Sequence, residues 1–308
     1  MSQSTNKACF ATLALGPQHI FHARQLAMDL EFFAPAHSLL VLSDQPHAFD
    51  KHPNVRALRH QQQSVFRCFH DKRFLIDASL HHAGTCIVID SNVRILAPIA
   101  ADAFEDLEPG ISAAHLYSIE SKWRSDENNR EHASKKEQAS LSREKHIVGK
   151  ALRVIGTTPN EARFPQEYLY AIKGSDKATQ VREWLGAWSN LAHYFDFHRL
   201  PWSEGFGIGL AAAATAMPVE CVRILPDSAY YKERTHLFNL KTFRNPVSRE
   251  QERCHAQQTL LKESFDSQRF SFLQTRIKQL NRFGRLRLRH WSDAVWLDAL
   301  RKTAQTAN

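Results

Sequence analysis

The stretch from Cys86 to Leu96 constrains the fold of this 308-residue chain more than any other. Four apolar residues, Cys86 to Ile89, lead directly into Asp90, and an amide follows at Asn92. A short run rich in Ile and Val predicts a strand that is buried on both faces of a sheet. Burying a carboxylate at the end of such a strand is costly unless it meets a cation or hydrogen-bond donors. Because ligands of open α/β sheets bind beyond the carboxyl ends of the strands, Asp90 and Asn92 are the first candidates for a site.

The residues before this stretch alternate between strand and helix patterns. Strands are predicted at 10–15, 38–42 and 54–58, and helices at 18–33 and 72–82. Pro35 ends the first helix, and Gly84 closes the second. Together with the strand at 86–89, the order is β-α-β-β-α-β. This order predicts a Rossmann-like α/β fold, with a mixed, mostly parallel sheet flanked by helices.

The patterns after Leu96 are weaker. A strand is predicted at 111–119, a solvated helix or loop at 120–145, and a strand or short helix at 147–156. Apolar spacing then predicts two helices within 165–194, an Ala-rich helix ending before Pro218, and a strand at 219–225. The last part, 248–303, is predicted to be helical throughout and is basic.

The composition favours anionic partners and a reducing compartment. The formal net charge is +8 at pH 7, and the isoelectric point is near 9.3. Such a charge attracts nucleotide phosphates, nucleic acids or an anionic membrane face. Five cysteines without a CxxC pair are typical of a cytoplasmic protein with structural thiols and indicate no zinc site. We therefore expect a cytoplasmic location, with peripheral attachment to a membrane left open.

Much of the positive charge lies in the segment 269–291, which contains no acidic residue. Three interpretations stay open for it. It could be a helical cap with a solvated face, or a contact with anionic lipid headgroups, for which arginines beside leucines, phenylalanines and Trp291 are suited. The third is nucleic acid, but the segment contains no base-reading motif, so only non-specific binding is predicted.

Polar residues gather at one edge of the predicted sheet. Asp44 follows the second strand, Lys72 and Arg73 open a helix, and Asp77 lies one turn later. A cation at a helix N-terminus suits phosphate. The oxygen ligands of Asp90 and Asn92 suit a hard cation such as Mn²⁺ or Mg²⁺. Together these residues predict a site for a diphosphate bridged by a metal ion.

The stretch from Arg73 to Val93 resembles the segment of GT-A nucleotide-sugar glycosyltransferases that carries their Asp-x-Asp motif. The closest pattern is that of the retaining group that contains glycogenin and the lipopolysaccharide galactosyl- and glucosyltransferases. In that group an Arg opens a helix, and an apolar strand then ends in Asp-Ser-Asp. The resemblance covers about 8–97. This chain departs from the motif at Asn92, whose amide brings no charge.

The resemblance implies a GT-A-like fold and a UDP- or GDP-sugar donor. The first strand, at Leu13, and Asp44 would hold the nucleoside, and Lys72, Arg73, Asp77 and Ser91 would complete the donor site. Asp90 and Asn92 would bind the metal ion, joined by His236, with Lys241 a few residues on. Without a metal ion, Lys72, Arg73 or Arg94 would supply the positive charge.

Glu204 follows Ser203 at the start of the Ala-rich helix, between Trp202 and a run of glycines. One interpretation is a helix start capped by Ser203. The other makes Glu204 the catalytic carboxylate, which binds acceptor hydroxyls or faces the anomeric carbon, with glycines allowing close approach.

The chain is therefore predicted to be a glycosyltransferase, with a glycan, a lipid-linked molecule or a protein as acceptor. Its transferase domain would span 1–247, with a donor half at 8–97 and an acceptor half at 160–247, followed by a basic helical extension at 248–308. The alternative is a non-catalytic nucleotide- or sugar-binding protein, or a basic interaction protein, on the same fold.

Overall fold

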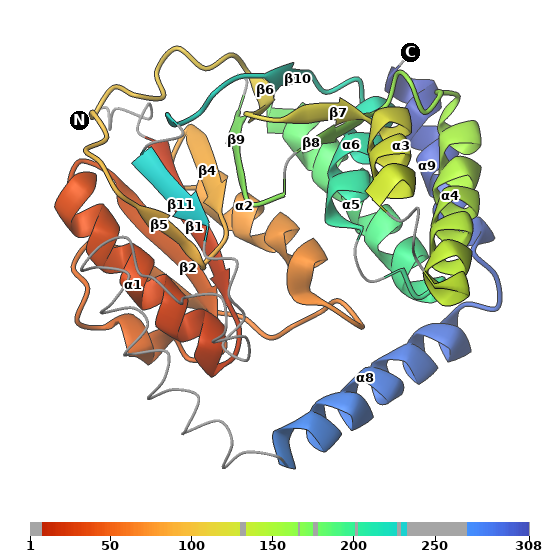
Figure 1. Ribbon diagram of the computed structural model, residues 1–308, viewed down its shortest axis with the longest axis horizontal. Coiled ribbons are helices and arrows are strands. Elements are labelled where there is room, and N and C mark those ends of the chain that lie inside the picture. Colours follow the sequence, from red (N-terminus) through yellow and green to blue (C-terminus); the bar gives the residue numbers. More distant parts are fainter. Residues whose placement is uncertain are drawn as a thin grey trace.

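The strand predicted at 86–89 lies near the middle of a seven-stranded sheet in the computed structural model. The structure describes residues 8–129, 134–165, 167–174, 178–200, 203–226, 229–232 and 270–307. The strand order is β10-β6-β9-β4-β1-β2-β3 (Figure 1). All five residues of β4 (Thr85–Ile89) are buried, as the apolar run predicts. The α/β class and the mostly parallel, mixed sheet are therefore confirmed.

The larger of the two parallel parts of the sheet comes from the first third of the chain. It consists of β1 (Ala8–Ala14), β2 (Ser38–Ser43), β3 (Val55–Arg59) and β4. The helices α1 (Pro17–Phe33) and α2 (Lys72–Leu80) connect these strands and pack against them, with short 3-10 turns at Pro46–Phe49 and Cys68–Asp71. The predicted β-α-β-β-α-β order is confirmed.

The sheet becomes mixed because β9 (Leu169–Lys173) runs antiparallel to both of its neighbours, β4 and β6 (Gly110–Ala113). The predicted helix at this position is wrong. Tyr168, Leu169 and Ile172 fit a helical spacing, but so few apolar residues cannot distinguish a helix from a fully buried strand. The last strand, β10 (Val219–Cys221), is shorter than predicted and runs parallel to β6.

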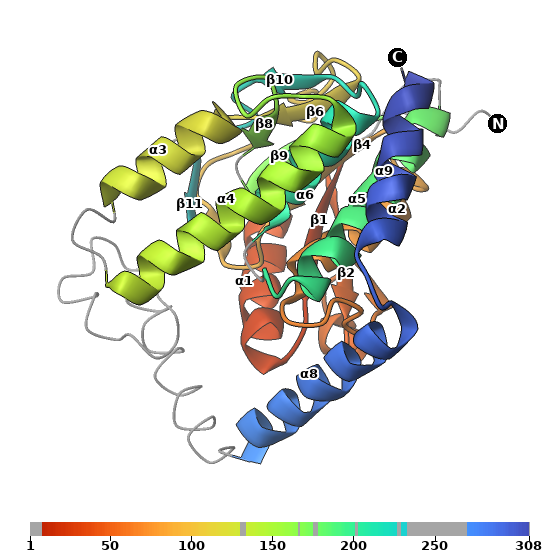
Figure 2. The same ribbon diagram turned by 90° about the vertical axis from the view of Figure 1, so that its right-hand side faces the viewer.

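Helices form a second body beside the sheet (Figure 2). It contains α3 (Ile119–Asn129), α4 (Lys135–Ile155), α5 (Ala178–Phe197), α6 (Glu204–Ala214) and α9 (Ala294–Ala307). Helix α4 includes most of 147–156, so a strand there is excluded. The charged segment 120–145 is helical on both sides of 130–133, which lie outside the described residues. Helix α8 (Phe270–Arg289) precedes α9, and 248–269 lies outside the described residues.

Short two-stranded ribbons complete the fold. The predicted strand at 111–119 is divided into β6 and β7 (Leu116–Ser118), and β7 pairs with β8 (Arg163–Pro165). The other ribbon joins β5 (Val93–Ile95), directly after the Asp90 turn, to β11 (Tyr230–Lys232).

The glycines of α6 allow other parts of the protein to approach closely. A Cβ at Gly209 would lie 1.6 Å from the carbonyl oxygen of Arg163, and one at Gly205 would lie 2.5 Å from the ring of Phe164. At Gly207 it would lie 2.6 Å from the indole nitrogen of Trp188. These glycines therefore allow α6 to pack closely against β8 and α5. The sequence analysis instead expects them to allow close approach to a sugar.

Gly209→Ala is expected to lower the free energy of unfolding by about 1–3 kcal/mol or more, because backbone must move to admit the methyl group. Gly186→Ala in α5 is the matched control. Its new Cβ would have no neighbour within 4 Å, so the change should stabilise the helix by about 0.5–1 kcal/mol. Urea unfolding of both variants measures these effects. Equal effects of the two substitutions would contradict the close packing of α6.

Candidate functional site

The carboxyl ends of β1 and β4 lie side by side at the point where the strand order changes direction. From β1, the parallel strands continue through β2 and β3 on one side and through β4 on the other. Ligands of open α/β sheets bind at such a switch point. Gly16 follows the carboxyl end of β1 and Asp90 follows that of β4. The two strand ends therefore lie at the same end of the sheet.

Two polar contacts stabilise the loops at the carboxyl ends of these strands. The backbone N–H of Gly16 donates to Oδ1 of Asp44 at 3.0 Å, and Gly16 has a φ of 82°, which only glycine adopts readily. The hydroxyl of Ser91 lies 3.2 Å from Nδ1 of His19, in the first turn of α1. Asp44 and Ser91 thus lie at the carboxyl ends of the strands, and Leu13 is buried within β1 beside Leu42.

The centre of the site is the buried ammonium group of Lys72, the first residue of α2. Its Nζ lies 2.6 Å from Oδ1 of Asp90 and 2.9 Å from Oε1 of Glu204, and it donates to the backbone carbonyl of Glu167 at 2.9 Å. These three partners use the three N–H donors of the ammonium. We call Lys72, Asp90, Glu204, Glu167 and Tyr170 the Lys72 cluster.

The carboxyl groups of this cluster outnumber its cation. Glu204, the first residue of α6, is only 3% exposed, and it accepts a hydrogen bond from the hydroxyl of Tyr170 at 3.2 Å. Burial raises the pKa of Glu204 above its usual range, while the Lys72 ammonium, 2.9 Å away, opposes this shift and favours the charged carboxylate. Burial likewise raises the pKa of Glu167, whose Oε1 accepts the N–H of Gly205 at 2.7 Å.

Lys72 stays protonated in this setting. Burial favours its neutral form, but the charges and hydrogen bonds of Asp90 and Glu204 outweigh burial and raise the pKa of the ammonium. Lys72 is 4% exposed, whereas 24% of the Asp90 side chain is exposed. Asp90 is therefore the member of the Lys72–Asp90–Glu204 triad that can reach a ligand.

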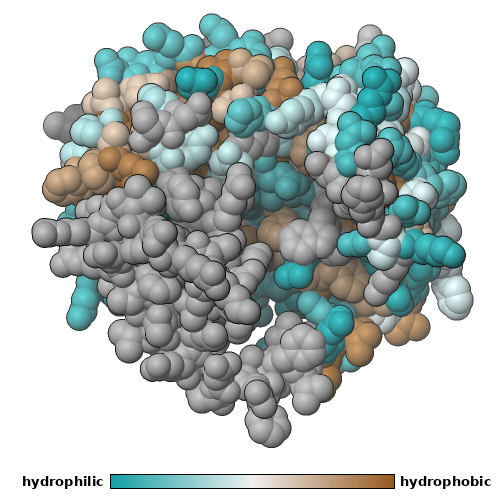
Figure 3. Space-filling model, viewed as in Figure 1, coloured by the Kyte–Doolittle hydropathy of each residue, from teal (hydrophilic) through white to brown (hydrophobic). Residues whose placement is uncertain are grey.

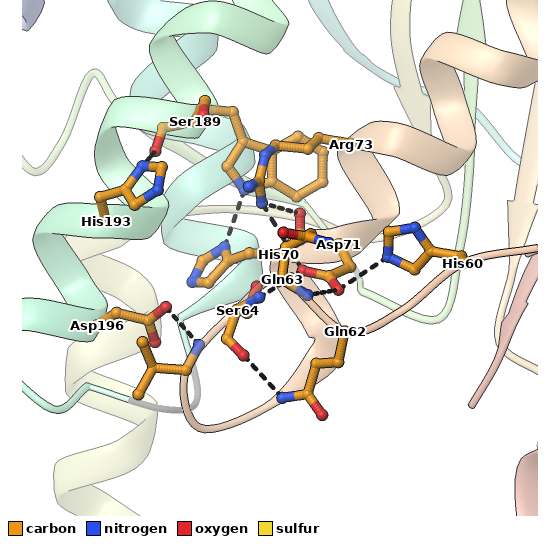
Figure 4. A network of polar contacts seen from close by, with 12 residues as sticks. His60, Gln62, Gln63, Ser64, His70, Asp71, Arg73, Ser189, His193 and Asp196 are labelled. Carbon is orange, nitrogen blue, oxygen red and sulfur yellow. Dashed lines mark hydrogen bonds and ion pairs between the residues drawn. The ribbon is translucent and has the colours of Figure 1, made fainter. Parts of the chain in front are cut away.

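The structure places Arg73 in a different network (Figure 4). Its Nη1 donates to the backbone carbonyl of His70 at 2.7 Å, and its guanidinium lies over the ring of Phe74 at 4.2 Å. Burial lowers the pKa of Arg73, while Asp71 and Asp196 oppose that shift. Arg73 thus belongs to the buried network that fixes the loop before α2.

Two other predicted residues also lie apart from Lys72. Asp77 is exposed, and its carboxylate is 3.9 Å from the imidazole of His81. Arg94 forms a bidentate pair with Asp29 of α1, at 2.6 and 2.7 Å, so its guanidinium joins β5 to α1. Ser203 occupies the N-cap position of α6 but makes no capping bond. Its hydroxyl donates to the carbonyl of Leu200 and lies 2.9 Å from Nε2 of His70 instead. The predicted cap is therefore wrong.

Glu167 and Tyr170 are not among the site residues that the sequence predicts. Both lie in the segment for which apolar spacing predicts a helix, so neither is expected near the carboxyl end of β4. In the structure the N–H of Asp90 donates to the carbonyl of Tyr168 at 2.9 Å, which holds this segment beside Asp90. A correct assignment of β9 would have placed both residues next to β4.

The predicted metal ligands are compatible with a cation that arrives together with a diphosphate. Asp90 and the half-buried Asn92 carry side-chain oxygens two residues apart in the sequence. Within the described ranges, no group of three or more His, Cys, Asp or Glu side chains could hold a metal ion. Mg²⁺ commonly takes one or two carboxylates and completes its shell with water and substrate phosphates. His236 and Lys241 lie outside the described residues.

The molecular surface is hollowed where the sheet meets the helical body. Figure 3 shows a hydrophilic hollow near the middle of the face seen in Figure 1. The ribbon in the same view has the sheet on one side of this position and the helices α5 and α6 on the other (Figure 1). A polar recess of this kind suits a charged ligand better than an apolar one.

Comparison with known proteins assigns the chain to no family. No protein-family model matches the chain, and no curated protein matches it significantly. Among the helices of the described segments, none is both long and apolar enough to cross a membrane.

Lys72→Met is expected to lower the free energy of unfolding by about 3–5 kcal/mol, because it leaves buried carboxylates without their cation. The control is Lys145→Met, which removes an ion pair to Glu127 whose side chains are 31% and 52% exposed. That change should cost no more than about 1 kcal/mol. Chemical unfolding at neutral pH compares the two. Equal costs would show that the Lys72 cluster does not stabilise the fold.

Proposed function

We propose that the protein is a glycosyltransferase that uses a nucleotide-diphosphate sugar as donor. The observation that carries this proposal is the convergence of Lys72, Asp90 and Glu204 at the switch point between β1 and β4. They come from α2, the end of β4 and α6, which lie far apart in the sequence. A charged cluster assembled from separate elements at the ligand-binding edge of an α/β sheet is typical of an active site.

The resemblance to GT-A glycosyltransferases supports the same proposal. The fold expected from it, a mixed and mostly parallel sheet with flanking helices, agrees with the observed sheet. The Asp-Ser-Asn sequence follows a fully buried strand, as the Asp-x-Asp motif does in that family. The finer assignment to the GT-A fold is part of this proposal.

The charge of the site favours a cation that accompanies the donor. One ammonium faces the carboxyl groups of Asp90, Glu204 and Glu167, and all its N–H groups already have acceptors. A diphosphate would add further negative charge. Asp90 and Asn92 would hold Mn²⁺ or Mg²⁺, which neutralises the departing diphosphate when it is bound.

The remaining residues of the site position the donor. Gly16, tied to Asp44, and Leu13 of β1 would border the nucleoside, and Ser91 would fix the turn that presents Asp90. Lys72 holds the Asp90 carboxylate in one orientation, so little reorganisation is needed when the donor binds. Glu204 is buried against Lys72 and Tyr170, and we assign it to positioning Lys72. The acceptor would be a glycan, a lipid-linked molecule or a protein.

The second candidate is a non-catalytic nucleotide- or sugar-binding protein on the same fold. The burial of Glu204 favours it, because the carboxylate that was predicted to face the anomeric carbon is only 3% exposed. Donor hydrolysis distinguishes the two candidates, since a binding protein would hold the nucleotide sugar without cleaving it.

Isothermal titration with UDP and GDP, each with and without Mn²⁺, tests the proposal. One nucleotide is expected to bind, and more tightly with the metal ion. Asp90→Ala should weaken binding at least about tenfold, the effect of one charge-assisted contact, and should abolish hydrolysis of the matching nucleotide sugar.

Asp77→Ala is the control for this titration, because it removes an exposed carboxylate from α2. It should leave nucleotide affinity unchanged while the fold stays intact by thermal unfolding. If neither nucleotide binds in any of the four titrations, the protein is not a transferase of this kind. Unchanged hydrolysis in Asp90→Ala would remove Asp90 from the site.

A further inference from the structure

Helix α8 lies along the rim of the molecule (Figures 1 and 2). From its start at Phe270 to Trp291 the chain carries six Lys and Arg residues and no acidic one. They are Arg276, Lys278, Arg282, Arg285, Arg287 and Arg289. The two sides of the helix have different environments, and this difference indicates a second functional surface.

The inner side of α8 is packed against the protein. Gln279 donates to the backbone carbonyl of Phe66 at 3.0 Å, and Arg282 donates to that of Ser64 at 3.4 Å. The ring of Phe283 lies 5.6 Å from the ring of Phe66, and Leu286 is buried. These contacts fix which face of the helix points outward.

The outer side carries large apolar residues that are exposed in the part of the chain that the structure describes. Ile277, Leu280 and Leu288 are 56%, 67% and 77% exposed, and Trp291 just beyond the helix is 93% exposed. The first three follow helical spacing with Gly284 between them, so they form one stripe. Basic residues, including Lys278, Arg285 and Arg289, border this stripe and are also exposed. We call this surface the α8 face.

We propose that the α8 face binds the surface of an anionic lipid bilayer. A helix that lies in a membrane interface buries an apolar stripe at the level of the acyl chains and places Lys and Arg among the headgroups. The α8 face has this arrangement, with an exposed tryptophan, a residue that favours the interface. Burial of the stripe would remove three large side chains from water, while the arginines pair with lipid phosphates.

The apolar stripe distinguishes a membrane from nucleic acid. Phosphodiester backbones attract arginine, but they offer nothing to cover Ile277, Leu280 and Leu288. A helix that binds a nucleic-acid backbone is expected to present basic and polar residues at the centre of its contact face. In α8 the centre is apolar and the charges lie at its borders. This inference does not depend on the proposed transferase activity.

Sedimentation of the full chain with lipid vesicles tests the proposal. The protein should be retained by phosphatidylcholine vesicles that contain phosphatidylglycerol, less by pure phosphatidylcholine, and less as salt is raised. The triple variant Ile277→Ser/Leu280→Ser/Leu288→Ser should lose retention. Arg285→Gln and Arg289→Gln should each weaken retention about fivefold, as expected for about 1 kcal/mol per basic residue.

The matched control is Met28→Ser/Phe32→Ser, which removes two exposed apolar side chains from α1. It should bind vesicles as the wild type does, and all variants should keep the wild-type melting temperature because the altered residues are exposed. Failure of the wild type to bind anionic vesicles at low salt would overturn the proposal, as would full retention of the triple serine variant. Binding of a DNA duplex without vesicle retention would show that the α8 face recognises nucleic acid instead.

Discussion

The buried ammonium group of Lys72 is the interaction on which the rest of the site depends. Removing a lysine from water is costly, and it is tolerated here because all three N–H donors meet oxygen acceptors. The acceptors come from the end of β4, the start of α6 and the segment before β9. Lys72 therefore joins the parallel half of the sheet to the helical body. The same ammonium group also fixes the orientation of the Asp90 side chain.

A second buried network supports the first. Asp71, directly before Lys72, accepts hydrogen bonds from the N–H groups of Gln63 and Ser64, and from the Ser64 hydroxyl at 2.6 Å. His70 accepts from the indole of Trp188 through Nδ1, so its Nε2–H donates to Ser203, just before Glu204. Burial lowers the pKa of His70 to about 3, which keeps the ring neutral. The loop before α2 is thus tied to both ends of the Lys72–Glu204 pair.

The same loop also carries α8. Gln279 and Arg282 hold the carbonyls of Phe66 and Ser64, while the N–H of Val65 donates to Asp196 at 2.8 Å. A chain of hydrogen bonds therefore runs from α8 through Ser64 and Asp71 to the start of α2. Through these contacts the α8 face and the Lys72 cluster share one structural support, although they lie on different parts of the molecule.

The sequence predicted the parallel half of the fold and its edge well, because runs of Ile, Val and Leu separated by glycine and proline define strands and crossovers without ambiguity. Asp90 was found for the same reason, as an acid at the end of a fully buried strand. The β9 segment was misread because its apolar residues are too few to show a period. Glu167 was missed with it, and Lys72 could not be separated from Arg73, because only tertiary packing decides which neighbour turns inward.

A crystal structure of the protein with UDP or GDP and Mn²⁺ tests the central claim most directly. We expect the diphosphate to lie at the ends of β1 and β4, within reach of Asp90, while Lys72 keeps its contacts with Asp90 and Glu204. A nucleotide bound elsewhere, or a Lys72 that leaves both carboxylates, would contradict it.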